Sequence, residues 1–224
     1  MKIEKCGKIT LINGDCMEFM QTQKDKSFDL AIVDPPYGID AGNYERAGTQ
    51  GGKSLAKCKI YHSGDWDKNI PPKEYFEELK RVSENQIIWG GNYFLDYLSN
   101  TNCMIVWDKD NGRNRYADCE IAWTSFNSAV RKFLWRWHGF LQENNKHKQQ
   151  RIHPTEKPIA LYEWLLQNYA QPGQKILDTH GGSMSIAIAA HKLGFNLTII
   201  EKDPVYYEQA KKRLMEFQRQ LILF

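Results

Sequence analysis

The four residues Asp34-Pro35-Pro36-Tyr37 place a carboxylate, a carbonyl oxygen and an aromatic ring next to one another in the chain. Neither proline has an N–H, and Pro36 restricts the residue before it to an extended conformation, so the Pro35 carbonyl points in a fixed direction beside the Asp34 carboxylate. Two neighbouring acceptors suit a planar NH₂ group, and Tyr37 offers a flat face for a nucleobase, a contact worth about 1–3 kcal/mol. These residues predict a pocket for the exocyclic amino group of an aromatic heterocycle.

An apolar run directly before this motif predicts the element that positions it. Residues Phe28 to Val33 have the composition of a buried parallel strand, which places Asp34 at the carboxyl end of that strand. Ligands bind at this edge of open α/β sheets. The same residues could instead form a strand that ends in a proline turn with an exposed tyrosine, so the choice depends on the rest of the chain.

A second motif, His153-Pro154-Thr155-Glu156-Lys157-Pro158, precedes a predicted amphipathic helix from Ile159 to Tyr169. The N-terminus of a helix attracts anions, so this segment is a candidate for binding a negatively charged group. A proline-rich linker that runs into a helix is the alternative interpretation.

A glycine turn follows at the end of another predicted buried strand, Lys175 to Asp178. The turn, Thr179 to Ser185, leads into a helix of small residues from Ile186 to Leu193, and this order of strand, glycine turn and helix lets backbone amides approach a nucleotide closely. Glu201 ends the next predicted strand, about twenty residues after the glycines, where an acid binds ribose hydroxyls.

The remaining elements are predicted from apolar periodicity and turn residues. Strands are expected at Ile9 to Ile12, Gln86 to Trp89, Cys103 to Trp107 and Cys119 to Phe126, and helices at Cys16 to Met20 (with Asp15 as N-cap), after Pro71-Pro72 and after Asp203-Pro204. The run Gly90 to Phe94 predicts a tight turn with core aromatics.

Two segments have the composition of nucleic-acid contacts. Residues Arg131 to Arg151 interleave cations with aromatic rings, as in surfaces that grip phosphates and stack bases, although Phe133 and Trp135 could be the inward face of a strand. The glycine-rich stretch 39–70 predicts a mobile loop whose cations suit a phosphate backbone, with a solvated loop as the alternative. The predicted DNA contacts are Arg46, Lys53, Arg131, Lys132, Arg136, Trp137, Lys146, Lys148 and Arg151.

Composition favours an intracellular protein without a metal centre. The chain has 224 residues, a net charge of +3 and five cysteines, and these cysteines form neither a C-x-x-C pair nor a zinc pattern with histidine. We see no apolar stretch of signal-peptide or membrane-spanning length. We therefore expect one cytoplasmic domain over residues 1–224, with no membrane association and no bound metal.

The three blocks Asp34 to Tyr37, His153 to Pro158 and Asp178 to Ser185 with Glu201 resemble the amino-methyltransferases that act on DNA. The target-site block precedes the cofactor block, which is the permuted order of the beta class, and the short recognition region, about 127–152, is similar to that of compact phage and mobile-element enzymes. The resemblance covers nearly the whole chain. It implies a Rossmann-like S-adenosylmethionine-dependent fold, a mainly parallel seven-stranded α/β sheet with an antiparallel edge hairpin.

The activity implied by the resemblance is methyl transfer from S-adenosylmethionine to the N6 amine of a flipped-out adenine in double-stranded DNA, with Asp34, Pro35, Pro36 and Tyr37 as the catalytic residues. Cytosine-N4 methylation is the nearest alternative, because the same acceptors fit that amine. A catalytically silent DNA-binding protein is the alternative from another class, and the block order speaks against a protein-glutamine methyltransferase. A homodimer and a cognate restriction endonuclease remain open as partners.

The resemblance also implies the residues that hold the cofactor. Thr155 and Lys157 are expected at its carboxylate, Asp15 near its adenine and Glu201 at its ribose. His180 and Met184 stand where the family usually has Phe and Gly, and a side chain at 184 is expected to crowd the methionine end. The full predicted set is Asp15, Asp34, Thr155, Lys157, Asp178, His180, Gly181, Gly182, Ser183, Ser185 and Glu201.

Overall fold

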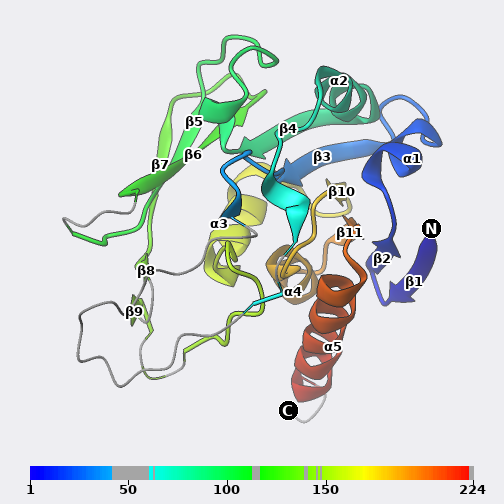
Figure 1. Cartoon of the computed structure of the whole chain (residues 1–224), viewed down its shortest axis with the longest axis vertical. Coiled ribbons are helices and arrows are strands. Elements are labelled where there is room, and N and C mark those ends of the chain that lie inside the picture. The colour runs from blue at the N-terminus through cyan, green and yellow to red at the C-terminus, as the bar shows by residue number, and fades with distance from the viewer. Residues whose placement is uncertain are drawn as a thin grey trace.

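The computed structural model describes residues 1–41, 61–62, 64–112, 117–138, 141–144, 146 and 148–221. The strands of this part of the chain, labelled in Figure 1, are β1 (Lys2–Cys6), β2 (Ile9–Asn13), β3 (Phe28–Val33), β4 (Ser83–Trp89), β5 (Met104–Asp108), β6 (Cys119–Thr124), β7 (Arg131–Leu134), β8 (Trp137–His138), β9 (Leu141–Gln142), β10 (Lys175–Asp178) and β11 (Asn196–Glu201). The helices are α1 (Cys16–Gln21), α2 (Lys73–Val82), α3 (Ile159–Tyr169), α4 (Ser185–Leu193) and α5 (Pro204–Leu221), with short 3₁₀ turns η2 (Asp65–Asp67) and η3 (Gly91–Tyr93).

A nine-stranded sheet runs in the order β1-β2-β11-β10-β3-β4-β6-β5-β7. The central strands β2, β11, β10, β3 and β4 are parallel, and β6 runs antiparallel to both β4 and β5. The prediction of a mainly parallel α/β sheet with an antiparallel hairpin is confirmed. The predicted count of seven strands is wrong, because β1 pairs with β2 and β7 extends the sheet beyond β5.

Helices cover both faces of this sheet, which explains why its central strands are apolar throughout. Leu30 and Ile32 of β3 pack in the core under α3, α4 and α5, whereas Ala31 and Val33 face the core under α1 and α2. Figure 1 shows these two helical layers on opposite sides of the strands. None of the helices in the described ranges has the length and apolar character needed to cross a bilayer.

The parallel direction of the central strands brings the predicted site blocks to one edge. Asp34 follows β3, Asp178 ends β10 and Glu201 ends β11, and these three strands are neighbours in the sheet. Residues far apart in the sequence therefore meet because the carboxyl ends of parallel strands share an edge.

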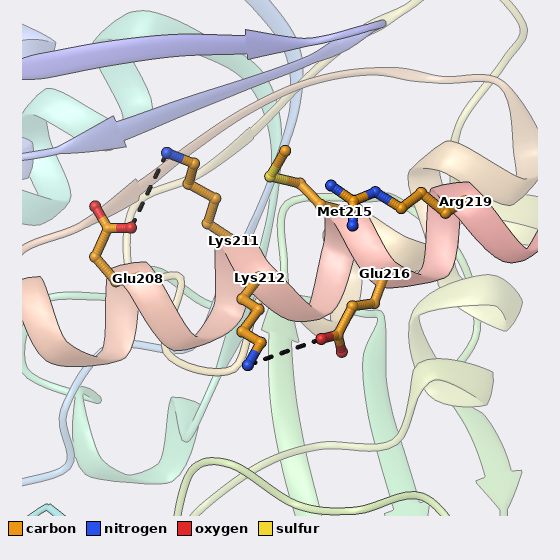
Figure 2. Close-up of a pocket in the computed structure, with 6 residues that line it drawn as sticks. All are labelled: Glu208, Lys211, Lys212, Met215, Glu216 and Arg219. Carbon is orange, nitrogen blue, oxygen red and sulfur yellow. Dashed lines mark ion pairs between the residues drawn. The ribbon is translucent and has the colours of Figure 1, made fainter.

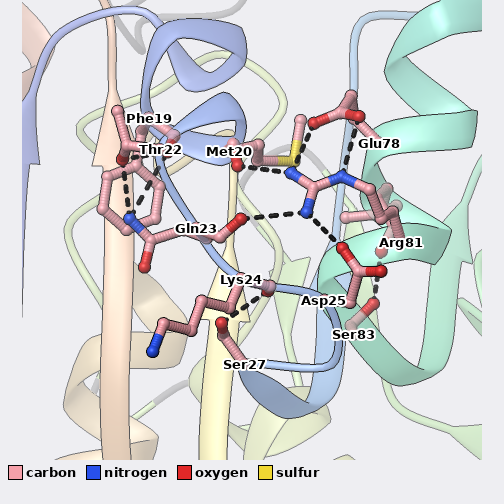
Figure 3. A network of polar contacts seen from close by, with 11 residues as sticks. Phe19, Met20, Thr22, Gln23, Lys24, Asp25, Ser27, Glu78, Arg81 and Ser83 are labelled. Carbon is pink, nitrogen blue, oxygen red and sulfur yellow. Dashed lines mark hydrogen bonds and ion pairs between the residues drawn. The ribbon is translucent and has the colours of Figure 1, made fainter.

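One side chain joins the first helix to the helix that covers the same face. The Arg81 guanidinium donates to the carbonyls of Met20 and Gln23 at the end of α1, and to the carboxylates of Asp25 and Glu78, at 2.7–2.9 Å (Figure 3). It thereby ties the C-terminal end of α1 and the two residues after its cap to α2.

Replacing Arg81 with methionine is expected to lower the free energy of unfolding by about 2 kcal/mol, because hydrogen bonds of a charged donor contribute about 1.5–3 kcal/mol and this side chain is only partly exposed. For a chain of this size the melting temperature falls by about 4–8 °C. Thermal unfolding followed by circular dichroism measures the change. Lys73→Met, which breaks an exposed pair with Glu77, is the control and is expected to cost less than about 0.5 kcal/mol. Equal melting temperatures for the two variants would contradict the role given to Arg81.

Candidate active site

Both carboxylate oxygens of Asp34 are hydrogen-bonded to side chains of the protein. The Tyr37 hydroxyl donates to Oδ1 at 2.6 Å, and the Lys157 ammonium donates to Oδ2 at 2.5 Å. Lys157 also donates to the Tyr37 hydroxyl at 3.1 Å, which closes a triangle of three polar groups. The structure thus brings together Asp34, Tyr37 and Lys157, which the sequence analysis had assigned to the target pocket and to the cofactor carboxylate.

A buried carboxylate that the sequence analysis did not single out fixes the turn after β3. Asp67 is 2% exposed, and its side chain accepts the backbone amides of Tyr37 at 2.6 Å, Gly38 at 3.0 Å and Ala41 at 2.9 Å. These three bonds hold the chain that carries Tyr37. Sequence position alone gave no signal for this, since Asp67 lies thirty residues away in a polar stretch.

The ring of Tyr37 is packed between aromatic side chains of the Gly90 to Phe94 run. It stacks on Tyr93 with a centroid separation of 4.9 Å and an interplanar angle of 12°, and it meets Phe94 edge-on at 6.1 Å. Gly90 has a φ of 71°, and a Cβ atom there would lie 2.2 Å from the Tyr37 ring. The Gly90 to Phe94 run, predicted as a turn with core aromatics, therefore packs around the Tyr37 ring. Within this run, Phe94 is buried and Tyr93 is 43% exposed.

Lys157 lies between two acids in the interior. Its Nζ atom is also 3.0 Å from Oε2 of Glu120, and the other oxygen of Glu120 pairs with Lys109 at 2.6 Å. Burial works to lower the pKa of Lys157, but the neighbouring carboxylates outweigh it and raise that pKa above its usual value. Burial works to raise the pKa of Glu120, and the two ammonium groups bring it down to about 2. Glu120 carries no sequence signal beyond being an acid in a strand.

The glycine turn after β10 lies against the end of β11. The Gly182 amide donates to Glu201 Oε2 at 2.6 Å, the Asp203 amide donates to Oε1 at 2.7 Å, and the Gly181 amide donates to the Ile200 carbonyl at 2.7 Å. A Cβ atom at Gly181 would lie 3.2 Å from the Ile200 carbonyl oxygen. A side chain at residue 181 would therefore crowd the end of β11, and close approach of these amides to a nucleotide stays a prediction.

The carboxyl groups of Asp178 and Glu201, at the carboxyl ends of β10 and β11, have pKa values above their usual range. Burial raises the pKa of Asp178 to about 8, although it accepts a hydrogen bond from the His180 amide, and burial raises the pKa of Glu201 to about 7. Burial lowers the pKa of His180 to about 4, so this ring is neutral at physiological pH. Buried carboxyls of this kind suit a cationic ligand, which would favour their ionised form.

The Met184 side chain is buried next to the glycine turn, where its Cγ atom would lie 3.3 Å from a Cβ atom added at Gly181. The residue is 1% exposed, belongs to the core cluster with residues of α4 and α5, and has a φ of 51°, in the left-handed region that favours glycine. This backbone conformation suits the glycine that the resemblance implies at this position. The expectation that the Met184 side chain crowds the methionine end of the cofactor stays a prediction.

Other predicted cofactor residues have internal partners. Asp15 caps α1 by accepting the Met17 amide at 2.8 Å and pairs with Lys202 at 2.9 Å. The hydroxyls of Ser183 and Ser185 lie 3.0 Å apart and are buried, and Thr155 Oγ1 lies 3.1 Å from His153 Nδ1. These residues border the same edge, but their hydroxyls are engaged within the protein.

Among the described residues, an indole nitrogen that lies one ring away from the glycine turn has no hydrogen-bond partner. Nε1 of Trp66 is buried, and its ring lies 4.9 Å from that of His153, which in turn packs over Gly182 and against Tyr206. A buried donor without an acceptor is unusual in proteins. Such a donor beside a glycine turn and two buried carboxyls fits a polar ligand bound at this edge.

In the basic segment, Arg131 to Arg151, some cations form ion pairs and some side chains are buried. Arg131 and Lys132 are exposed on β7, Lys132 pairs with Asp108 at 3.3 Å, and Arg136 pairs with Asp110. Lys146 and Lys148 are exposed, and the Arg151 guanidinium lies 4.5 Å from the centre of the Trp137 ring. Arg46 and Lys53 lie outside the described residues.

Trp137 differs from its prediction as a DNA contact. It is 6% exposed, and its indole donates to the Glu156 carbonyl at 2.8 Å, so in this conformation it belongs to the core. Phe133 and Trp135 also pack against the core from partly buried positions, as the alternative interpretation of the segment expected. Periodicity could not separate these rings, because an edge strand and an exposed aromatic surface have the same composition.

A hollow on the surface of α5 is separate from these groups. It is lined by Glu208, Lys211, Lys212, Met215, Glu216 and Arg219, with ion pairs along the helix (Figure 2). It contains none of the predicted site residues.

Comparison with known proteins agrees with this arrangement. Residues 85–212, more than half of the chain, match the family described as DNA methylase, N6_N4_Mtase. The Type II methyltransferases M2.DpnII of Streptococcus pneumoniae and M.HinfI of Haemophilus influenzae are 23% and 26% identical, over 92% and 93% of this chain and 90% and 69% of theirs. The crystal structure of the M1.HpyAVI–SAM complex has the same fold, with a TM-score of 0.55 and 21% identity over 92% of this chain and 99% of that one. This protein belongs to the N6_N4_Mtase family of DNA methylases.

Proposed function

We propose that this protein is a beta-class enzyme that transfers a methyl group from S-adenosylmethionine to the N6 amine of adenine in double-stranded DNA. The observation that carries the proposal is the position of Asp34 and its Pro-Pro-Tyr turn at the end of β3, directly beside β10 and its glycine turn. A target amine bound at Asp34 would lie next to a cofactor bound at the neighbouring strand. Relatives named Type II methyltransferases support the same activity.

Asp34 and the Pro35 carbonyl are the groups that act on the amine. Adenine N6 is a poor nucleophile because its lone pair is delocalised into the ring, and the base must leave the duplex at a cost of a few kcal/mol. The two acceptors take the two amino hydrogens, which draws the nitrogen toward a tetrahedral shape and turns its lone pair toward the methyl group. S-adenosylmethionine, when bound, supplies that methyl group from a sulfonium. Tyr37 offers its ring to the base, and a base that stacks on the face now covered by Tyr93 displaces Tyr93.

Asp178, Glu201, Gly181 and Gly182 are the residues proposed to hold the cofactor. The glycine turn allows close backbone approach, and the buried carboxyls suit a ligand that favours their ionised form. The Trp66 indole offers a donor that has no partner within the described part of the chain. Asp15, Thr155, Lys157, His180, Ser183 and Ser185 remain proposals in the same role.

The proposed DNA contacts are the cations of the basic segment and of the 39–70 stretch. Arg131, Lys132, Lys146 and Lys148 are exposed, and Arg136 needs only to exchange Asp110 for a phosphate. Arg46, Lys53 and Arg151 stay in the set. Trp137 is left out, because it is buried.

Cofactor binding is expected to strengthen as the pH rises from about 6 to about 8, because the pKa of Asp178 is about 8 and that of Glu201 is about 7. A cationic group beside Asp178, and ribose hydroxyls that donate to Glu201, favour the ionised forms of the two carboxyls, so binding releases protons. The affinity gains at most about tenfold per pH unit for each proton released. Calorimetry in two buffers of different ionisation enthalpy counts these protons. Asp178→Asn is expected to flatten the dependence near pH 8, and a proton count of zero for the unaltered protein would contradict the prediction.

The decisive test is incubation with labelled S-adenosylmethionine and mixed-sequence duplex DNA, followed by digestion and mass analysis of the nucleosides. N6-methyladenine supports the proposal. N4-methylcytosine supports the alternative that the family also covers. If no cofactor binds by calorimetry and no nucleoside is modified, the protein is a silent DNA-binding module.

A further inference from the structure

Four charged side chains form an alternating chain that ends at Asp34. Lys109 pairs with Glu120 at 2.6 Å, Glu120 lies 3.0 Å from Lys157, and Lys157 donates to Asp34 at 2.5 Å. Lys109 and Glu120 come from β5–β6, where the sequence gave no sign of a site. Glu120 therefore connects the hairpin of the sheet to the motif residues.

The two acids do not hold Lys157 in the same way. The contact with Asp34 is a hydrogen bond of 2.5 Å, whereas the contact with Oε2 of Glu120 is a longer ion pair of 3.0 Å, and this buried oxygen has no closer partner among the described residues. Lys157 thus holds Asp34 and Tyr37 by hydrogen bonds, with Glu120 as a weaker-held acceptor nearby. A small rotation of the ammonium would reach that acceptor.

Each oxygen of Asp34 already accepts a hydrogen bond from a protein side chain, so an arriving amine competes with Lys157 and Tyr37 for this carboxylate. Lys157 is 3% exposed, so water is a poor substitute partner if the ammonium leaves Asp34. A buried charge that loses its partner is strongly unfavourable, unless a second opposite charge is within reach. Glu120 is that second charge.

We propose that Glu120 is a positioning residue that acts through Lys157, by taking the ammonium from Asp34 when the target amine arrives. The inference rests on the proposed function, since the arriving group is the exocyclic amine. In the exchange, the Lys157 N–H turns from Asp34 Oδ2 to Glu120 Oε2, and the freed oxygen accepts a hydrogen of the substrate amine. No bond is broken other than hydrogen bonds, and Lys157 keeps its proton.

The charge of Glu120 also acts on Asp34. Burial raises the pKa of Asp34, the Lys157 ammonium lowers it, and the Glu120 carboxylate raises it again. Removal of the ammonium and removal of the Glu120 charge should therefore move the ionisation of Asp34 in opposite directions. The other ionisable groups that interact with Asp34 are Tyr37, Tyr75, Tyr162 and Asp178, and Lys109 lies on the far oxygen of Glu120.

The first experiment follows the Asp34 carboxyl by carbon-13 NMR in the free protein, assigned by its loss in Asp34→Asn. Glu120→Gln is expected to lower the titration midpoint by about 0.5–1 pH unit, and Lys157→Met to raise it, because a charge within a few ångströms shifts a pKa by about this much or more. Glu84→Gln, an exposed acid on β4, is the matched control and should leave the midpoint unchanged. Glu120→Asp, which keeps the charge, should restore the midpoint to near its original value.

The second experiment measures kcat/KM for methylation of duplex DNA across pH with the same variants. Glu120→Gln is expected to move the acid limb to lower pH and to lower the plateau about tenfold, because Lys157 then has no partner but Asp34. Unmoved NMR midpoints, or a plateau equal to that of Glu84→Gln, would overturn the role of Glu120. If the unaltered protein methylates no base, the proposed function and the exchange both fail, whereas methylation without the two opposite shifts overturns only the exchange.

Discussion

Asp34→Ala is expected to reduce the rate of methyl transfer to DNA by at least about 10- to 100-fold, because charge-assisted hydrogen bonds are worth about 1.5–3 kcal/mol. The loss should be larger than this, since the carboxylate also stabilises the positive charge that develops on the nitrogen. The structure adds that the fold should survive the change, because the buried Lys157 still has Glu120 as a partner.

Single-turnover methylation with labelled cofactor measures this prediction, with cofactor and DNA binding measured separately. Asp96→Ala, at an exposed aspartate after the Gly90 to Phe94 run, is the control and should keep the full rate. An Asp34→Ala enzyme that binds both ligands and methylates at the original rate would show that the amine is not activated by this carboxylate.

Gly90→Ala is expected to cost a comparable amount of activity, although residue 90 touches no substrate. A Cβ atom there would lie 2.2 Å from the Tyr37 ring. Because this distance is a steric clash, either the backbone at residue 90 or the Tyr37 ring has to shift. A shift of Tyr37 disturbs its hydrogen bond to Asp34 and the face offered to the base. A misplacement of about 1 Å in an active site can cost about 100-fold in rate.

Gly7→Ala is the matched control for this change. Gly7 has a similar positive φ, +64° against +71°, but no atom lies within 4 Å of its Cβ position. In both variants the left-handed backbone conformation costs about 1–2 kcal/mol of stability. Only in Gly90→Ala does the added Cβ atom also clash with the Tyr37 ring. Equal methylation rates for the two would contradict the claim that Gly90 positions Tyr37.

Local patterns were sufficient to predict most elements of this fold. The helix α3 has the predicted bounds, Ile159 to Tyr169, and the apolar spacing of Tyr75, Phe76, Leu79 and Val82 correctly predicted α2. The strand β1 was missed because Lys2–Cys6 is mostly charged and exposed, and its pairing with β2 is what makes it a strand. Whether an edge segment forms a strand depends on its hydrogen bonds to the adjacent strand, and the periodicity of the segment alone does not reveal that pairing.

The motifs of the candidate site could be predicted from the sequence, but the contacts between their side chains could not. Asp34 and Tyr37 could be recognised from chemistry next to a strand end. Their contact with Lys157, more than a hundred residues later, depends on how the 153–158 segment passes over β3. Glu120 and Asp67 have no motif, since their importance comes from burial beside specific groups that only the folded chain defines.

The bonds around Asp67 have a consequence for the stretch of chain between Ala41 and Tyr61. Backbone amides at 37, 38, 40 and 41 all donate to Asp67, so the chain before this stretch is hydrogen-bonded to the 3₁₀ turn η2 that follows it. Substitutions between Ala41 and Tyr61 change none of the residues that make these hydrogen bonds. The proposed DNA contacts of this stretch, Arg46 and Lys53, can therefore be replaced without loss of the hydrogen bonds that hold the backbone of Tyr37.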